Sequence, residues 1–218
     1  MKLLICQAKH ENNLETLEKL LIDCPDVDYM LFPEGYLNDI DSLNKAKLLA
    51  KKYHTYIISS LRQNGDVAIV IDDFGNILYN RKKTASRDEE KLLNPLFFID
   101  SDHQKNVGFL LCMEILKGMR DLPLIHYDFI LQPIGVGMFS EEQFDLWLNE
   151  AIKIAKKFNT IVIGASHSDG SYKNCGVSIP ISYCIDSNGV PVYVLKNQLK
   201  TQIIEITDNN SVRLIHSF

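Results

Sequence analysis

The sequence has no apolar run long enough to cross a membrane. Its longest apolar stretches, such as YIIS and VAIVI, fall far short of the ~20 residues that span a bilayer. The first residues, MKLLICQAKHE, carry a lysine, but their apolar stretch is too short for a signal peptide and charged residues follow at once. We therefore expect a cytoplasmic protein with no membrane partner.

An excess of positive charge is also missing. The chain has 23 Lys and Arg against 28 Asp and Glu, a formal net charge of −5. Proteins dedicated to nucleic acids carry basic surfaces that neutralise phosphates. The charge balance therefore indicates that nucleic acid is not a partner.

Signatures of metal and nucleotide sites are absent as well. The five cysteines are odd in number and none has CxxC spacing, so neither a disulfide framework nor a zinc ribbon is indicated. The six histidines show no HxH or HExxH spacing, and the lone GxG at residues 135–137 does not begin a GxGxxG motif. We therefore expect neither a metal site nor a dinucleotide-binding site.

What the sequence does contain is an ordinary globular composition. Of its 218 residues, 46% are apolar and 23% are charged, which is typical of a folded soluble domain. No internal repeat, low-complexity tract or linker divides the chain, so residues 1–218 are expected to form a single domain.

Short apolar runs dominate the chain and predict roughly ten strands with four helices. Strand-length runs lie at residues 2–8, 29–34, 56–61, 67–72, 77–79, 96–100, 107–112, 127–133, 160–166, 177–186, 190–195 and 200–207. Many of these runs are continuously apolar, which is typical of strands covered on both faces. We therefore expect an α/β fold with two stacked mixed sheets between outer helices, a four-layer α-β-β-α sandwich.

Helical spacing marks three of the expected helices. The first contains Leu14, Leu17, Leu20 and Leu21 and has Asn12 or Asn13 as its expected N-cap, and the second covers residues 42–53 with Asp41 or Ser42 as cap. The third begins at Ser140, where SEEQ fits the S-x-x-E/Q capping box.

Three predicted strands end in side chains of complementary chemistry. One strand ends at Glu34, another runs into residues 81–83 (Arg-Lys-Lys), and a third ends at Cys112. A thiol nucleophile, a carboxylate base and an ammonium that stabilises developing negative charge are together sufficient for covalent acyl transfer. Taken one by one, a buried cysteine, a solvated glutamate and a basic turn are more common than a site.

The order of these motifs resembles that of the nitrilase, or carbon–nitrogen hydrolase, superfamily along almost the whole chain. DYMLFPEGYL resembles the family's first-glutamate motif, GNILYNRKKTA resembles its lysine segment, and VGFLLCMEI resembles its nucleophile segment. KLLICQA, QPIG, LWLNEAIKIAKKFNTIVIGAS and CGVSIPISYCIDSNGVPV resemble further family segments in the same order.

The resemblance implies a role for each matching residue. Glu34 would be the general base, Cys112 the nucleophile, and the backbone N–H of Met113 an oxyanion donor. Lys83, eight residues after Gly75 as in the family, would be the electrophilic lysine in preference to Lys82. The family's second glutamate would be Glu90, with Glu89 as the alternative. The resemblance further implies an α-β-β-α sandwich, no cofactor and a homodimer.

The chain departs from the family in the segments that usually line the substrate pocket. The intervals from Glu34 to Lys83 and from Lys83 to Cys112 are shorter than usual, Ala85 stands where the family has histidine, and the FPE segment after the nucleophile is replaced by ILKGMRDLP with Arg120. A more open pocket, a different substrate or a lost activity would each account for these changes.

Two functions therefore compete. The first is a hydrolase that cleaves a non-peptide carbon–nitrogen bond of a small amide through a Cys112 thioester, with carbamoyl compounds and nitriles as alternative substrates. The second is a catalytically silent homodimer that acts as a binding or scaffold protein. A Cys112–His167 dyad is a further arrangement, and it requires contact between those two side chains.

Overall fold

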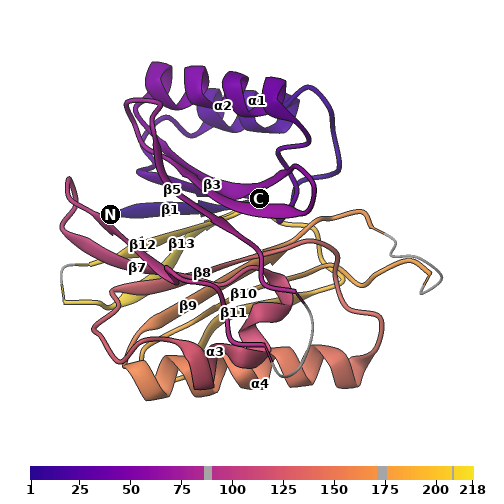
Figure 1. Ribbon diagram of the computed structural model, residues 1–218, viewed down its shortest axis with the longest axis vertical. Coiled ribbons are helices and arrows are strands. Elements are labelled where there is room, and N and C mark those ends of the chain that lie inside the picture. Colours follow the sequence, from indigo (N-terminus) through magenta and orange to yellow (C-terminus); the bar gives the residue numbers. More distant parts are fainter. Residues whose placement is uncertain (86–89, 171–175, 208) are drawn as a thin grey trace.

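The computed structural model describes residues 1–85, 90–170, 176–207 and 209–218 (Figure 1). Within these residues the chain forms two stacked sheets, and helices cover the outer face of each (Figure 1). The predicted four-layer α-β-β-α sandwich is therefore confirmed.

The first sheet has seven strands among the described residues, in the order β13-β12-β1-β2-β3-β4-β5. β1 is parallel to β2 and β2 to β3, whereas the remaining neighbours are antiparallel, so the sheet is mixed. The strands are β1 (Lys2–Ile5), β2 (Tyr29–Leu31), β3 (Tyr56–Arg62), β4 (Asp66–Ile71), β5 (Ile77–Lys82), β12 (Gln202–Ile206) and β13 (Val212–Ser217).

The second sheet has six strands in the described part of the chain, in the order β11-β10-β9-β8-β7-β6. It is mixed as well, because β7, β8 and β9 run parallel and the outer pairs run antiparallel. The strands are β6 (Phe97–Asp100), β7 (Lys105–Phe109), β8 (Phe129–Ile134), β9 (Ile161–Ser166), β10 (Ile181–Ile185) and β11 (Pro191–Lys196).

The helices divide between the two outer faces. α1 (Glu15–Asp23) and α2 (Ile40–Tyr53) cover the seven-stranded sheet, and α3 (Ile115–Asp121) and α4 (Glu141–Phe158) cover the six-stranded sheet (Figure 1). A short 3₁₀ turn, η1 (Cys112–Glu114), precedes α3. None of the helices within the described ranges is long and apolar enough to cross a membrane.

Alternating side chains explain why the strands read as continuous apolar runs. In β1, Leu3 and Ile5 belong to the core between the sheets, whereas Leu4 belongs to the core beneath α1 and α2. All three are fully buried. A strand that is covered on both faces needs apolar residues at every position, and this condition holds for the central strands of both sheets.

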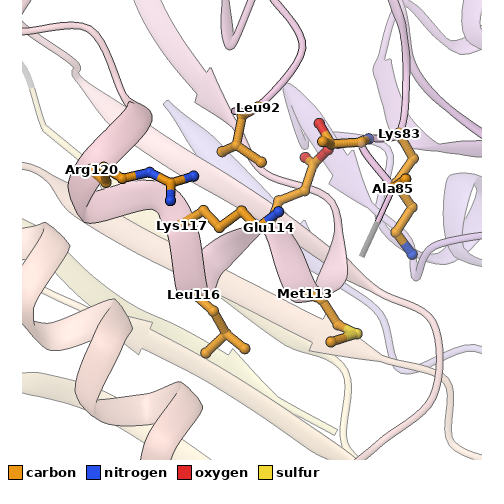
Figure 2. Close-up of a pocket in the computed structure, with 9 residues that line it drawn as sticks. Lys83, Ala85, Leu92, Met113, Glu114, Leu116, Lys117 and Arg120 are labelled. Carbon is orange, nitrogen blue, oxygen red and sulfur yellow. The ribbon is translucent and has the colours of Figure 1, made fainter. Parts of the chain in front are cut away.

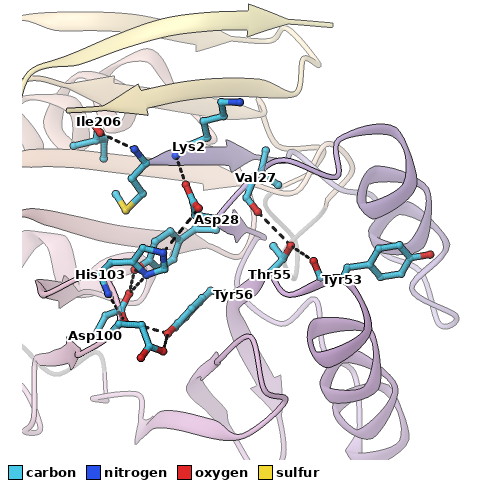
Figure 3. A network of polar contacts seen from close by, with 12 residues as sticks. Lys2, Val27, Asp28, Tyr53, Thr55, Tyr56, Asp100, His103 and Ile206 are labelled. Carbon is cyan, nitrogen blue, oxygen red and sulfur yellow. Dashed lines mark hydrogen bonds and ion pairs between the residues drawn. The ribbon is translucent and has the colours of Figure 1, made fainter. Parts of the chain in front are cut away.

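A buried polar cluster joins the two sheets at one edge of the sandwich (Figure 3). The Asp100 carboxylate, at the end of β6, accepts hydrogen bonds from the hydroxyls of Tyr29 in β2 and Tyr56 in β3, the latter at 3.1 Å. His103 Nδ1 lies 2.8 Å from the same carboxylate. Asp100 is fully buried, so these contacts replace the water that a carboxylate would otherwise need.

Two of the three predicted helix caps are wrong. α2 begins at Ile40, and its cap is Asp39, whose carboxylate accepts the Ser42 N–H at 2.8 Å. α1 has Leu14 at its N-cap, and the Glu11 carboxylate instead accepts the Thr16 N–H at 2.9 Å. The Ser140 cap of α4 is confirmed, because its hydroxyl accepts the Gln143 N–H.

Candidate active site

Glu34 lies in a tight turn immediately beyond β2. Pro33 lacks an N–H and cannot extend the strand pairing, so the chain turns and carries the Glu34 carboxylate toward the second sheet. The side chain is buried, and burial raises the pKa of its carboxyl, against the opposing effect of Lys83. A carboxylate with a raised pKa is a stronger base near neutral pH.

Lys83 follows β5 directly, and its ammonium Nζ lies 2.7 Å from Glu34 Oε1. Its backbone N–H donates to the Asp66 carbonyl, which holds the residue against β4. Burial opposes its positive charge, but Cys112 and Glu34 more than compensate and raise the pKa of the ammonium. Lys82 is exposed, so the structure places Lys83, and not Lys82, beside Glu34.

Cys112 begins η1 just beyond β7, with a backbone φ of +50°. This left-handed conformation is uncommon for a residue with a side chain and marks a sharp turn at which the thiol is presented. The Glu34 carboxylate raises the pKa of the thiol, whereas the Lys83 ammonium and the Gly135 backbone lower it. Burial, followed by the Glu34 charge, raises the pKa of the Cys112 thiol to about 12. At neutral pH Cys112 is therefore a thiol, and its deprotonation needs a base.

Buried side chains hold the backbone of Cys112 in this conformation. Gln132 Nε2, from β8, donates to the Cys112 carbonyl at 2.9 Å. The Tyr183 hydroxyl, from β10, donates in turn to Gln132 Oε1. Sequence reasoning missed both residues, although a glutamine inside the apolar run FILQPI was a detectable signal of a polar contact.

Glu114 joins the segment that carries Lys83 to the segment that carries Cys112. Its buried carboxylate accepts two hydrogen bonds from the Arg81 guanidinium, at 2.8 and 2.6 Å. It also accepts the backbone N–H of Thr84 at 2.8 Å and that of Leu111 at 2.7 Å. Four donors satisfy this buried charge, so Glu114 fixes the distance between the two segments.

Gly135, just beyond β8, makes room for the Glu34 carboxylate. A Cβ at this position would lie 2.7 Å from Glu34 Oε2, which is closer than carbon and oxygen atoms approach without a shift of one of them. The absence of a side chain therefore lets Glu34 and Cys112 meet beneath the Gly135 backbone.

A small pocket of about 220 Å³ opens beside this group (Figure 2). Lys83 lies at one side, and Lys117 and Arg120 extend from α3 at the other (Figure 2). Its lining residues are Lys83, Thr84, Ala85, Leu92, Met113, Glu114, Leu116, Lys117 and Arg120. Met113, whose backbone N–H is the predicted oxyanion donor, is 44% exposed and contributes to this lining.

The second predicted glutamate, Glu90, contacts α3 through its backbone carbonyl. The Glu90 carbonyl accepts hydrogen bonds from Lys117 Nζ at 3.0 Å and from Arg120 Nη2 at 3.1 Å. Its role in positioning Lys83 stays a prediction, and Glu89 lies outside the described residues. Asp66 is the additional acid that acts on the site, because its charge raises the pKa of both Glu34 and Lys83.

His167 contacts backbone atoms and not the thiol. Its Nε2 lies 3.1 Å from the Glu34 carbonyl and its Nδ1 lies 3.1 Å from the Ala8 carbonyl. The Cys112–His167 dyad is therefore wrong, because both ring nitrogens already face carbonyl oxygens.

His10, His167 and Asp169 also form a cluster of possible metal ligands. The two imidazole rings are stacked with centroids 3.7 Å apart and an interplanar angle of 17°. Ring nitrogens bind metals in the plane of the ring, and parallel stacked rings do not aim their nitrogens at a shared ion. The cluster does not fit a metal centre.

Comparison with solved structures identifies proteins of similar architecture. A carbon–nitrogen hydrolase from Helicobacter pylori G27 matches with a TM-score of 0.72 and 16% identity, over 92% of this chain and 87% of that chain. An amidase from Nesterenkonia sp. matches with a TM-score of 0.73 and 15% identity, over 95% and 90%. A double mutant of the amidase from Nesterenkonia sp. AN1 in complex with acrylamide matches with a TM-score of 0.75 and 13% identity, over 96% and 91%.

Comparison at the level of sequence adds nothing to these matches. No protein-family model and no curated protein matches the chain. What this chain shares with the solved amidases and hydrolases is therefore the fold.

Proposed function

We propose that this chain, which has the fold of the nitrilase superfamily, is a carbon–nitrogen hydrolase that cleaves a small amide. The observation that carries the proposal is the meeting of Glu34, Lys83 and Cys112, which arrive from three separate strands. The Lys83–Glu34 ion pair measures 2.7 Å, and the charges of both residues act on the pKa of the Cys112 thiol. The solved amidases that share the fold support the same reaction class.

The first half of the reaction acylates Cys112. As the sulfur attacks the amide carbon, the thiol proton moves to the Glu34 carboxylate and the carbonyl π electrons move to oxygen. The Lys83 ammonium and the Met113 N–H stabilise this oxyanion, an effect worth about 3 kcal/mol for one such donor. Collapse of the tetrahedral intermediate breaks the C–N bond, and Glu34 returns the proton to the departing ammonia or amine.

The second half hydrolyses the thioester. Glu34 takes a proton from a water molecule, whose oxygen attacks the thioester carbon. The C–S bond then breaks, the carboxylic acid leaves, and the proton held by Glu34 restores the thiol. This cycle needs no metal or organic cofactor, and Glu90 is proposed to assist by orienting Lys83.

The dimensions of the pocket favour a small substrate. Its volume of about 220 Å³ is below the ~300–1,000 Å³ of sites for drug-sized ligands. Small aliphatic amides are therefore the first choice for assay, ahead of carbamoyl compounds and nitriles.

The test is turnover of a panel of small amides by the wild-type protein and by Cys112→Ala, with ammonia release as the readout. We expect turnover in the wild type, and a decrease to the background rate in Cys112→Ala. Cys24→Ala is the matched control, because Cys24 is a free cysteine outside the site, and it should retain wild-type activity. Turnover that survives Cys112→Ala contradicts the proposal.

We extend the proposal to a single-domain, cytoplasmic homodimer. The supporting feature is β13, an edge strand of the seven-stranded sheet, on and beyond which Leu214, Ile215 and Phe218 are 39%, 40% and 48% exposed. Light scattering of the purified protein tests the assembly: the mass of two chains supports a dimer and that of one chain contradicts it.

A further inference from the structure

The turn that carries Glu34 depends on the orientation of one peptide. Tyr36 N–H donates to the Pro33 carbonyl at 3.4 Å, so residues 33–36 form a β-turn. Gly35 has a φ of +75°, which is the value that a type II turn requires at its third position. Glu34 occupies the second position, and the Glu34–Gly35 peptide is the central peptide whose orientation distinguishes type II from type I.

This central peptide is hydrogen-bonded at both of its polar atoms. The Gly35 N–H donates to Ser60 Oγ, from β3, at 2.6 Å. The Glu34 carbonyl is met by His167 Nε2, from the segment after β9, at 3.1 Å. Reversal of the peptide would break both contacts and change the backbone angle ψ of Glu34. Ser60 and His167 therefore hold the peptide from the two sheets at once.

The imidazole of His167 is itself fixed in place. It is fully buried, its Nδ1 faces the Ala8 carbonyl at 3.1 Å, and its backbone N–H donates to the Gly135 carbonyl at 3.4 Å. A neutral imidazole has one N–H, so with Nε2–H donating to the Glu34 carbonyl, Nδ1 lies against the Ala8 carbonyl without a hydrogen bond. Burial and the backbone contact with Gly135 hold the ring between the Glu34 turn and the end of β8.

His10 covers the outer face of this imidazole. The His10 ring stacks on His167, its Nδ1 lies 3.2 Å from the Asp169 carboxylate, and its Nε2 lies 3.3 Å from an Arg62 guanidinium nitrogen. Arg62 can only donate, so His10 Nε2 is the acceptor and Nδ1–H donates to Asp169. These contacts hold the His10 ring against His167.

We propose that His167 is a positioning residue for the catalytic base: by holding the Glu34 carbonyl it fixes the central peptide of the turn and keeps the Glu34 carboxylate at Cys112 and Lys83. The inference rests on the proposed function only for the role of Glu34 as base. The chemistry itself does not involve His167, which touches neither the thiol nor the pocket.

Two conservative variants of His167 differ in whether they can still reach the Glu34 carbonyl. The amide of His167→Gln reaches the position of Nε2 and can still donate to the Glu34 carbonyl. The shorter amide of His167→Asn reaches only the position of Nδ1 and cannot donate to the Glu34 carbonyl. Thr55→Val is the stability control, because it removes a buried hydrogen bond to the Val27 carbonyl at the far end of the sheet.

Hydrogen exchange of the Gly35 amide, measured by NMR, is the direct readout. We expect His167→Asn to speed this exchange about fivefold, the effect of one lost hydrogen bond, while His167→Gln and Thr55→Val leave it at the wild-type rate. Wild-type exchange at Gly35 in His167→Asn would overturn the inference, as would equal acceleration in the Asn and Gln variants.

The alkylation rate of Cys112 by iodoacetamide, followed against pH, connects this readout to the site. His167→Asn should slow alkylation and displace its pH profile, and His167→Gln should restore both. If Gly35 exchange responds as expected but wild-type Cys112 reacts no faster than in Glu34→Gln, the positioning inference stands and the proposed function fails. If Cys112 is reactive and both His167 variants leave its pH profile unchanged, the inference fails and the proposed function stands.

Discussion

At the scale of single residues, the site depends on buried charged side chains, each of which is paired with an opposite charge or with hydrogen-bond donors. Glu114 is the clearest case, because its carboxylate binds the Arg81 guanidinium and the backbone N–H groups of Thr84, beside Lys83, and of Leu111, beside Cys112. Removing one partner of a buried ion pair leaves the other charge without compensation. Such a residue affects both stability and the distance between Lys83 and Cys112.

We predict that Glu114→Gln lowers the free energy of unfolding by about 3 to 5 kcal/mol, because the buried Arg81 guanidinium loses its counterion. Urea denaturation measures this value. Glu150→Gln is the matched control, since the Glu150–Lys153 pair lies on the α4 surface and should change stability by less than about 1 kcal/mol. Equal effects of the two substitutions would show that the Arg81–Glu114 pair is not the anchor we describe.

A second prediction concerns the pH dependence of turnover. Burial raises the pKa of Glu34 above its ordinary value of 4.5, and only the carboxylate form accepts the thiol proton. Activity is therefore present above the folded-state pKa of Glu34 and is lost as the pH falls through it, so the acid limb of kcat/KM should lie above pH 4.5. An acid limb at or below pH 4.5, measured on the most active amide of the panel, would contradict this assignment.

At the scale of elements, the polar cluster of Figure 3 connects the sheets at an edge where apolar packing ends. Asp100 in β6 binds the hydroxyls of Tyr29 and Tyr56 from the opposite sheet. These contacts join β6 of one sheet to β2 and β3 of the other. The cluster therefore contributes to the relative placement of the two sheets.

We predict that Asp100→Ala destabilises the fold by about 3 kcal/mol, because the Tyr29 hydroxyl and the backbone N–H groups of Asp102 and His103 lose a charged, buried acceptor. Thermal unfolding measures the change. Asp102→Ala is the control: among the described residues its carboxylate accepts a hydrogen bond from the Tyr56 hydroxyl alone, and Tyr56 can still donate to Asp100, so this substitution should cost less. If Asp102→Ala lowered the stability as much as Asp100→Ala, Asp100 would not be the residue that connects the two sheets.

The elements themselves were largely predictable from the sequence, and their caps show where prediction stopped. Strand-length apolar runs and the capping box at Ser140 are local signals, and both were confirmed. Asp39 was missed as the cap of α2 because helical spacing became visible only after Ile40, and the choice between neighbouring Asp and Ser residues depends on backbone angles. Helix α3 has only seven residues, too few for a periodic pattern.

The site was predictable in its order but not in its supports. Resemblance to a family identified Glu34, Lys83 and Cys112 because each stands at a strand end in a recognisable sequence. Gln132 contacts Cys112, and His167 contacts Glu34, only because the folded protein brings their segments together. Each pair is far apart in the sequence, and no local sequence pattern indicates which partner each side chain contacts. The role of Glu90 stays a prediction for the same reason.

At the scale of the whole molecule, buried titratable groups make stability depend on pH. Burial lowers the pKa of His167 from 6.5 to about 4, so between these values the unfolded chain binds a proton that the folded chain does not. Stability is therefore full above pH 6.5 and is lost as the pH falls toward 4, by on the order of 3 kcal/mol.

The check is the free energy of unfolding at pH 7 and at pH 4.5 for the wild type and for His167→Gln. The variant has no imidazole at this position, so its loss of stability over this interval should be smaller. Parallel losses in the two proteins would mean that His167 does not control acid sensitivity.

The central claim is that Glu34 and Lys83 make the buried Cys112 a nucleophile, and the rate of iodoacetamide alkylation at each cysteine, resolved by mass spectrometry, tests it most directly. Burial and a thiol pKa of about 12 would by themselves make Cys112 slow to react. The account predicts that Cys112 is nevertheless alkylated faster than the other four cysteines, and that Glu34→Gln removes this advantage. A Cys112 that reacts no faster than buried Cys6 or Cys184, or one whose rate is unchanged in Glu34→Gln, would contradict it.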